Sequence, residues 1–209
     1  MRSLLTLIAS SAAYGFSIGL SNSTVYAVRN LVKFPLLILS TCAICAMCYF
    51  VLARFLSVTL TFVHVQKVVI AIFRDVAKLL AALALAVAFF ALTCDPPEPG
   101  SVDDFSVFLG LNVLAIAVCG CVAVYRCSAE HLPSDVVAPK HRKWLLSAWM
   151  VTSLLVGGQT CWLIRPFFGV STTADWTSPW FSGSEPGFRG ARSFYEAVWF
   201  AISPPDESY

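Results

Sequence analysis

The chain has 209 residues, of which 58% are hydrophobic and only 12% are charged. A soluble domain of this size usually carries about twice that share of charged residues, so the composition excludes an ordinary soluble domain and indicates a membrane protein. The formal net charge of +2 is too small to favour nucleic acid as a partner.

Five stretches are apolar and long enough to cross a bilayer as helices, because a hydrocarbon core of about 30 Å needs about 20 apolar residues. They are Leu4–Leu20, Pro35–Ala53, Val76–Cys94, Phe105–Tyr125 and Trp144–Phe167. The sequence therefore predicts an all-α integral membrane protein, with five transmembrane helices in residues 1–169 and a short aromatic periplasmic segment in residues 170–209.

The first of these stretches is the least hydrophobic, and it shares features with a secretory signal peptide. It follows the basic residue Arg2 and contains the small residues Ser11, Ala12 and Ala13, which a signal peptidase accepts. We expect it to be retained as a transmembrane helix that polar residues such as Tyr14 make weakly hydrophobic.

The distribution of basic residues predicts the orientation. With five spans, one side of the membrane carries nine Lys and Arg residues, and the other side carries five, among them Arg29 and Lys33 in a loop. Because basic loops stay in the cytoplasm, the N-terminus is predicted to be cytoplasmic and the C-terminus periplasmic. The loop over residues 95–104 has four acidic residues and no basic ones, and it lies on the predicted outer side.

Small residues recur at helical spacing in the third and fifth predicted spans, and more weakly in the fourth, with Ala117, Gly120 and Ala123. The third span carries a stripe of alanines at intervals of three and four residues, namely Ala77, Ala81, Ala84, Ala88 and Ala91. The fifth span repeats a small-residue pattern with Ser153, Gly157 and Cys161. Since small residues let helix backbones approach closely in lipid, these patterns predict packing surfaces, either within the bundle or toward another subunit.

Few polar side chains are expected at membrane depth. Asn112 and Gln159 are neutral and suit hydrogen bonds between helices, each contributing about 1 kcal/mol. Arg165 ends the fifth span, where it can pair with Glu196, hold a lipid phosphate or cap helix carbonyls. No acidic residue lies near the centre of a predicted span, which argues against an ion-coupled transporter.

The sequence predicts no metal, cofactor or catalytic site. Cys42, Cys45 and Cys48 fall on one side of a helix, but deep in lipid and without His or acidic partners, so we expect them to be apolar filler. The histidines in residues 127–143 fit no standard ligand spacing. Because nucleophile elbows, phosphate-binding glycine loops and paired carboxylates are also missing, an enzyme is not expected.

The C-terminal segment is rich in aromatic residues, among them Trp176, Trp180, Phe194 and Trp199. Ser193 and Glu196 have the spacing of a capping box, which predicts a short helix over residues 194–202. We expect this helix either to lie on the outer membrane face or fold back on the bundle, or to dock a partner.

Four short motifs are spread over nearly the whole chain. They are Tyr14-Gly15-Phe16-Ser17-Ile18-Gly19, Lys33-Phe34-Pro35-Leu36-Leu37, Gly158-Gln159-x2-Trp162-x2-Arg165-Pro166-Phe167-x-Gly169 and Phe194-Tyr195-Glu196. Their order resembles that in a group of bacterial five-span inner-membrane proteins, whose hydrophobic layout is similar to that of Yip-type membrane proteins. The resemblance implies a helical bundle in the bacterial inner membrane, and it implies no catalytic residues.

These observations predict a non-catalytic accessory, assembly or scaffold subunit of a larger membrane protein complex, with membrane lipids and other membrane protein subunits as partners. The alternative is a small channel or carrier, with a polar path near Asn112, Gln159 and Arg165. A membrane enzyme that acts on lipid is a third hypothesis, and no catalytic group supports it.

Overall fold

The computed structural model describes residues 2–93, 103–132, 137, 139–165, 167, 180–181 and 191–202. Within these residues the regular structure is entirely helical, and no strand occurs. The helices are α1 (Arg2–Gly19), α2 (Thr24–Phe55), α3 (Phe62–Thr93), α4 (Asp103–His131), α5 (Pro139–Ile164) and α6 (Phe194–Ile202). The all-α prediction is therefore confirmed, and the tail helix predicted over residues 194–202 is α6.

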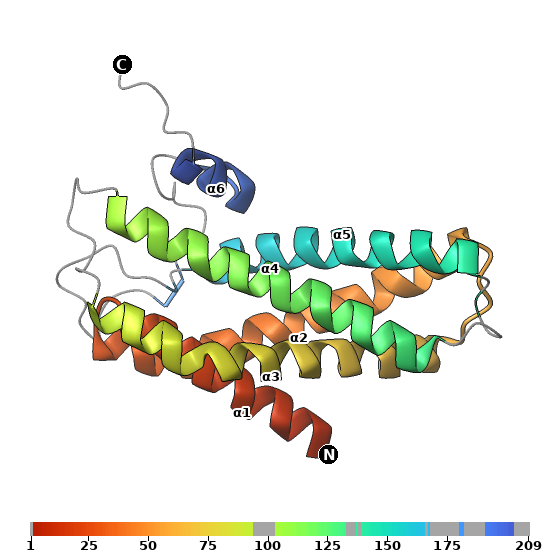
Figure 1. Ribbon diagram of the computed structural model, residues 1–209, viewed down its shortest axis with the longest axis horizontal. Coiled ribbons are helices and arrows are strands. Elements are labelled where there is room, and N and C mark those ends of the chain that lie inside the picture. The colour runs from red at the N-terminus through yellow and green to blue at the C-terminus, as the bar shows by residue number, and fades with distance from the viewer. Residues whose placement is uncertain are drawn as a thin grey trace.

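Helices α1 to α5 form an elongated bundle, and α6 lies beside one end of it (Figure 1). The most extensive contacts are those of α1 with α3 and with α2. Beyond these three helices, α5 packs mainly on α2, and α4 packs mainly on α3. Helix α1 thus packs on α2 and α3, and α5 and α4 are attached to these same two helices.

Three helical segments are long and apolar enough to cross a membrane: α2, α3 and residues Val107–Cys127 of α4. In α1 the apolar segment is shorter and covers Ser3–Gly19. In α5 small and polar residues, including those at positions 157–160, interrupt the apolar sequence. These helices indicate a membrane-embedded protein, whereas the expected five-span arrangement is not confirmed.

The long helices begin earlier than the predicted spans. Ser23 caps α2 by accepting a hydrogen bond from the Tyr26 backbone N–H at 3.4 Å. Pro35, predicted to open the span, therefore lies inside α2, a position that membrane helices tolerate. The predicted spans mark only the apolar part of each helix, because hydropathy does not report where backbone hydrogen bonding begins.

Glycine residues bring α1 close to α2. A Cβ atom at Gly15 would lie 2.5 Å from the Asn30 carbonyl oxygen, and one at Gly19 would lie 2.4 Å from Ala27 Cα. Ser11, one turn before Gly15, is fully buried, and its hydroxyl donates to a carbonyl of its own helix at 2.8 Å. Small residues four positions apart thus form one face of α1, and the two glycines on it contact α2 directly.

An aromatic pair joins α2 to α5. The rings of Tyr49 and Trp149 are fully buried and stacked, with centroids 4.5 Å apart. The Tyr49 hydroxyl donates to the Trp149 carbonyl at 3.0 Å, and Trp149 Nε1 donates to the Tyr49 carbonyl at 3.3 Å. Ser153 Oγ forms a further hydrogen bond with the Tyr49 hydroxyl. These bonds satisfy the polar groups of both rings inside the bundle.

Candidate functional site

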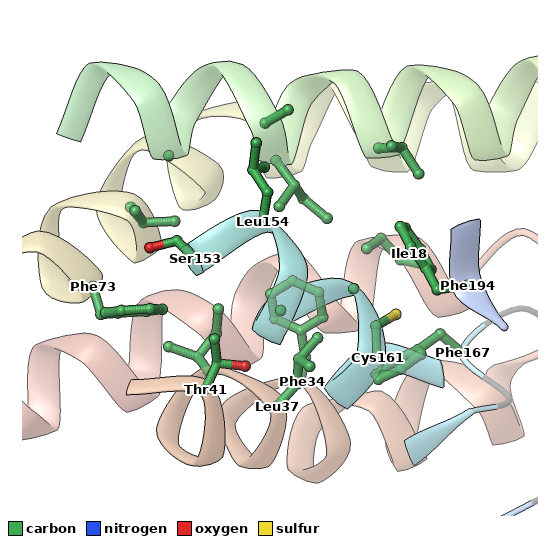
Figure 2. Close-up of a pocket in the computed structure, with 18 of the residues that line it drawn as sticks. Ile18, Phe34, Leu37, Thr41, Phe73, Ser153, Leu154, Cys161, Phe167 and Phe194 are labelled. Carbon is green, nitrogen blue, oxygen red and sulfur yellow. The ribbon is translucent and has the colours of Figure 1, made fainter. Parts of the chain in front are cut away.

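A cavity of about 170 Å³ lies inside the bundle and has wall residues from all six helices. Figure 2 shows Ile18, Cys161, Phe167 and Phe194 at one end of it. Its lining is almost wholly apolar, with hydroxyl groups from Thr41 and Ser153. A cavity with such walls excludes water and suits apolar groups.

Small residues on facing helices create this space. A Cβ atom at Gly120 of α4 would meet no other atom within 4 Å, and one at Gly157 of α5 would lie 3.7 Å from Thr41 Cγ2. All three residues of the predicted α5 pattern, Ser153, Gly157 and Cys161, line the cavity. These three small residues of α5 therefore line the cavity, and Gly157 also faces α2.

The alanine stripe lies on the inner side of α3. Its first and last members, Ala77 and Ala91, are buried, and the three between them are half-buried. On the opposite side of the helix, Ala82, Ala86 and Phe90 are exposed. The structure places the stripe where it packs within the bundle, and its use by a second subunit stays a prediction.

Asn112 is buried and connects α4 to α1. Its side-chain oxygen accepts a hydrogen bond from the Tyr14 hydroxyl at 2.9 Å, and its side-chain nitrogen donates to the Phe108 carbonyl at 2.8 Å. The Tyr14 ring in turn lies 5.2 Å from the ring of Phe34 in α2. This hydrogen bond thus connects two helices, α1 and α4, that both pack on α3.

Replacing Tyr14 with phenylalanine removes the interhelical donor to Asn112. We expect a loss of about 1 to 2 kcal/mol in unfolding free energy, because a buried acceptor then lacks its partner. Titration with sodium dodecyl sulfate, followed by circular dichroism, measures this loss. The double variant Tyr14→Phe/Asn112→Leu should be less destabilised than the sum of its single variants, and strict additivity would contradict the contact.

Gln159 and Arg165 lie apart from Asn112. Gln159 is exposed on α5. Arg165 is half-buried, and its guanidinium carbon lies 3.5 Å from the centre of the Trp162 ring, which is a cation–π contact. The carboxylate of Glu196, its predicted partner, accepts a backbone N–H that precedes α6. Among the described residues, the cavity wall includes none of the three predicted polar residues.

Sequence reasoning missed a polar group near the start of α2. Arg29, Asn30 and Lys33 are almost fully buried, although the two basic residues were predicted to lie in a loop. Asn30 Nδ2 donates to the Phe167 carbonyl at 2.8 Å. Lys33 Nζ lies 5.7 Å from the centre of the Phe167 ring. The sequence feature that could have identified this group is the spacing of Arg29 and Lys33. They are one helical turn apart, so a helix places both on the same face.

Two aromatic residues of the tail complete this group. The Arg29 guanidinium carbon lies 5.4 Å from the centre of the Trp180 ring, and Lys33 Nζ lies 5.2 Å from that of Phe181. We refer to the six residues as the aromatic–cation cluster: Arg29, Asn30, Lys33, Phe167, Trp180 and Phe181. Trp176, also predicted to be part of the aromatic tail surface, lies outside the described residues.

The aromatic–cation cluster lies at one end of the apolar part of α2. Lys33 and Arg54 are separated by residues 34–53, and these 20 residues span about 30 Å of helix. Because this length matches the hydrocarbon thickness, we expect the cluster to lie where lipid head groups begin. Phe167 belongs both to the cluster and to the cavity wall, so the cluster adjoins one end of the cavity.

The tail helix α6 folds back on α5 and α4. Its capping serine is as predicted, since Ser193 Oγ accepts a hydrogen bond from the Glu196 backbone N–H at 3.2 Å. The Tyr195 hydroxyl lies 2.9 Å from the carbonyl oxygens of both Leu154 and Leu155. Burial raises the pKa of Tyr195, so this phenol remains a donor at neutral pH. These contacts bring Phe194 to the cavity wall and leave Trp199 exposed.

Gly158 provides the space into which α6 docks. A Cβ atom there would lie 2.7 Å from both Phe194 Cδ1 and the Tyr195 hydroxyl oxygen. We expect Gly158→Leu to detach α6 and to raise amide hydrogen exchange in residues 194–202 by about tenfold or more. Gly157→Ala is the matched control, because its added methyl group has ordinary contacts. Unchanged exchange in Gly158→Leu would contradict this docking.

The cysteine and histidine side chains are the groups that could bind a metal ion. Cys42, Cys45 and Cys48 are free thiols in α2. His141 Nδ1 lies 3.2 Å from the Leu56 carbonyl oxygen and connects two helix ends. In the part of the chain that the structure describes, no three His, Cys, Asp or Glu side chains are grouped so as to hold a metal ion.

No protein-family model, curated protein or solved structure matches the chain. The resemblance to bacterial five-span inner-membrane proteins therefore stays a prediction. Any function must be argued from the cavity, the aromatic–cation cluster and the exposed helix faces.

Proposed function

We propose that the protein is a non-catalytic accessory, assembly or scaffold subunit of a larger membrane protein complex. The outer face of α4 supports this proposal best. It exposes apolar side chains at intervals of three and four residues, namely Val107, Leu111, Leu114, Val118, Val122 and Tyr125. These residues form one continuous apolar face of the helix, which can pack against a helix of another membrane protein.

The interior supports the same proposal. Polar side chains within the bundle, such as Tyr14, Tyr49 and Asn112, donate to or accept from neighbouring helices. Internal bonds of this kind let the bundle fold around its own core. The apolar face of α4 is then available to a second membrane protein.

Extraction in a gentle detergent, followed by native mass spectrometry, tests this function. We expect at least one other membrane protein to remain bound. Leu114→Trp and Val118→Trp, which change the shape of the α4 face, should release it. Val51→Trp on the exposed face of α2 is a matched control and should retain the partner. A monomer without any co-purifying protein would contradict the proposal.

We further propose that the protein resides in the bacterial inner membrane with a cytoplasmic N-terminus and a periplasmic C-terminus. The excess of basic residues on one side of the predicted spans supports this orientation. A reporter that is active only in the periplasm should therefore work after Tyr209 and fail at Ser134. The opposite pattern would overturn the orientation.

A small channel or carrier is the alternative proposal, although, in the described part of the chain, none of its three polar residues lines the apolar cavity. The predicted polar path requires Asn112, Gln159 and Arg165 to share a water-filled space, although Asn112 is buried and Gln159 is exposed. A membrane-impermeant thiol reagent can test cysteines placed at positions 112 and 159 in a variant without native cysteines. Protection of both positions would remove this alternative.

A further inference from the structure

One wall of the cavity is formed by two helices, α4 and α5, that have little contact with each other. The contact between α4 and α5 is small compared with the contacts that attach each of them to the bundle. Val113 and Ala117 of α4 and Leu154 and Gly157 of α5 line the cavity. Because two loosely joined helices form this wall, an apolar molecule in the membrane can reach the cavity between them.

The lining selects the chemical class of the occupant. Apolar cavities of about 150 Å³ in proteins stay dry and bind small apolar molecules. The present cavity of about 170 Å³ has comparable size and similar Ile, Leu, Phe and Val walls. In a membrane the most abundant apolar group is the lipid acyl chain. We therefore expect a segment of one lipid acyl chain to occupy the cavity.

Charge at one end of the cavity selects the head group. Phe167 and Cys161 form that end, and Lys33 Nζ lies over the Phe167 ring. Arg29 lies one turn before Lys33 on the same helix. Arg165 lies between Cys161 and Phe167 in the sequence. The aromatic–cation cluster lies at head-group level, where basic side chains attract anionic phosphate groups.

We propose that the cavity binds one acyl chain of an anionic phospholipid, which enters between α4 and α5 and places its phosphate beside the aromatic–cation cluster. This lipid site does not depend on the proposed role as a subunit. A protein that binds no partner can still hold the lipid, and the experiments on the two proposals have separate readouts.

Two glycines of α4 provide a matched pair for the test. A Cβ atom at either Gly120 or Gly110 would meet no atom within 4 Å, but Gly120 lines the cavity and Gly110 is exposed outside it. Leucine at either position makes the same change in helix propensity. Only Gly120→Leu places a side chain where the acyl chain is proposed to lie.

The protein and its two variants are reconstituted in vesicles of equal parts phosphatidylglycerol and phosphatidylcholine, extracted in mild detergent and analysed by native mass spectrometry. We expect the original protein and Gly110→Leu to retain one phosphatidylglycerol, and Gly120→Leu to retain at least fivefold less. Equal retention by all three proteins would overturn the cavity as the site. Equal retention of both lipids would overturn the anionic head group.

A second measurement covers the case in which Gly120→Leu fails to fold. A phosphatidylglycerol with a photoreactive group in its acyl chain is cross-linked to the unchanged protein, and the labelled residues are mapped by mass spectrometry. We expect labels at wall residues such as Ile38 and Val113 in excess over exposed residues such as Leu114. Labels confined to exposed residues would overturn the proposal.

Discussion

Gly15→Leu will prevent α1 from docking and will leave little folded protein. An added Cβ atom would lie 2.5 Å from both the Asn30 carbonyl oxygen and Phe34 Cβ. Neither atom can move without moving the backbone of α2. We therefore expect a loss of about 3 kcal/mol or more in unfolding free energy, at the upper end of overpacking effects. Size-exclusion chromatography in detergent and denaturant titration measure the result.

Gly110→Leu is the control for this variant. The same side chain is added there in open space, so the chromatographic profile should stay unchanged. Gly15→Ala should already show part of the defect, because the clash arises at the Cβ atom itself. A normal melting temperature for Gly15→Leu would show that α1 does not pack on α2 as described.

Trp149→Ala will destabilise the bundle by about 3 to 5 kcal/mol, the cost typical of removing a large buried aromatic side chain. Trp149 is fully buried, stacks on Tyr49 and bonds to its carbonyl. Its loss leaves a cavity between α2 and α5 and removes the hydrogen bond from Nε1 to the Tyr49 carbonyl. Denaturant titration followed by far-ultraviolet circular dichroism measures the change.

Trp149→Phe separates the two contributions of this residue. Phenylalanine keeps an aromatic ring against Tyr49 but has no N–H group for the carbonyl, so we expect it to recover most of the stability. The remaining difference from the unchanged protein should be about 1 kcal/mol. Equal losses for the alanine and phenylalanine variants would contradict a stabilising stack.

The features that local sequence controls were predicted well. The bounds of α6 agree with the prediction, because a capping serine determines where a short helix begins. Asn112 makes the predicted kind of hydrogen bond, since a buried amide in an apolar helix needs a partner. In both cases the chemistry of a single side chain, a capping hydroxyl or a buried amide, determines the hydrogen bond that it forms.

The features that depend on distant contacts were not predicted. Arg29 and Lys33 precede an apolar segment that begins with proline, so they were placed in a loop although α2 includes them. What the sequence did not reveal is the aromatic partner of each, because Phe167 and Trp180 follow more than 130 residues later. Spacing along one helix cannot show which distant ring will cover a basic side chain.

The cavity was also beyond the reach of the sequence. Small residues at helical spacing predict close packing, and Gly15 and Gly19 do pack closely. Gly120 also belongs to a pattern of small residues at helical spacing, but it faces open space. Whether a glycine is covered depends on the angle at which the next helix crosses, and that angle results from all the contacts of the bundle together.

The unequal attachment of the helices has a consequence for motion. Helix α4 is held mainly by α3, and the Tyr14–Asn112 hydrogen bond connects it to α1. Parts of a protein with few contacts open at the lowest free energy, so we expect the small contact between α4 and α5 to open before the contacts that attach these helices to α3 and α2. Collective helix movements take microseconds to milliseconds. We therefore expect the exchange of molecules into the interior to depend on the time that α4 and α5 need to move apart, and not on unfolding of the protein.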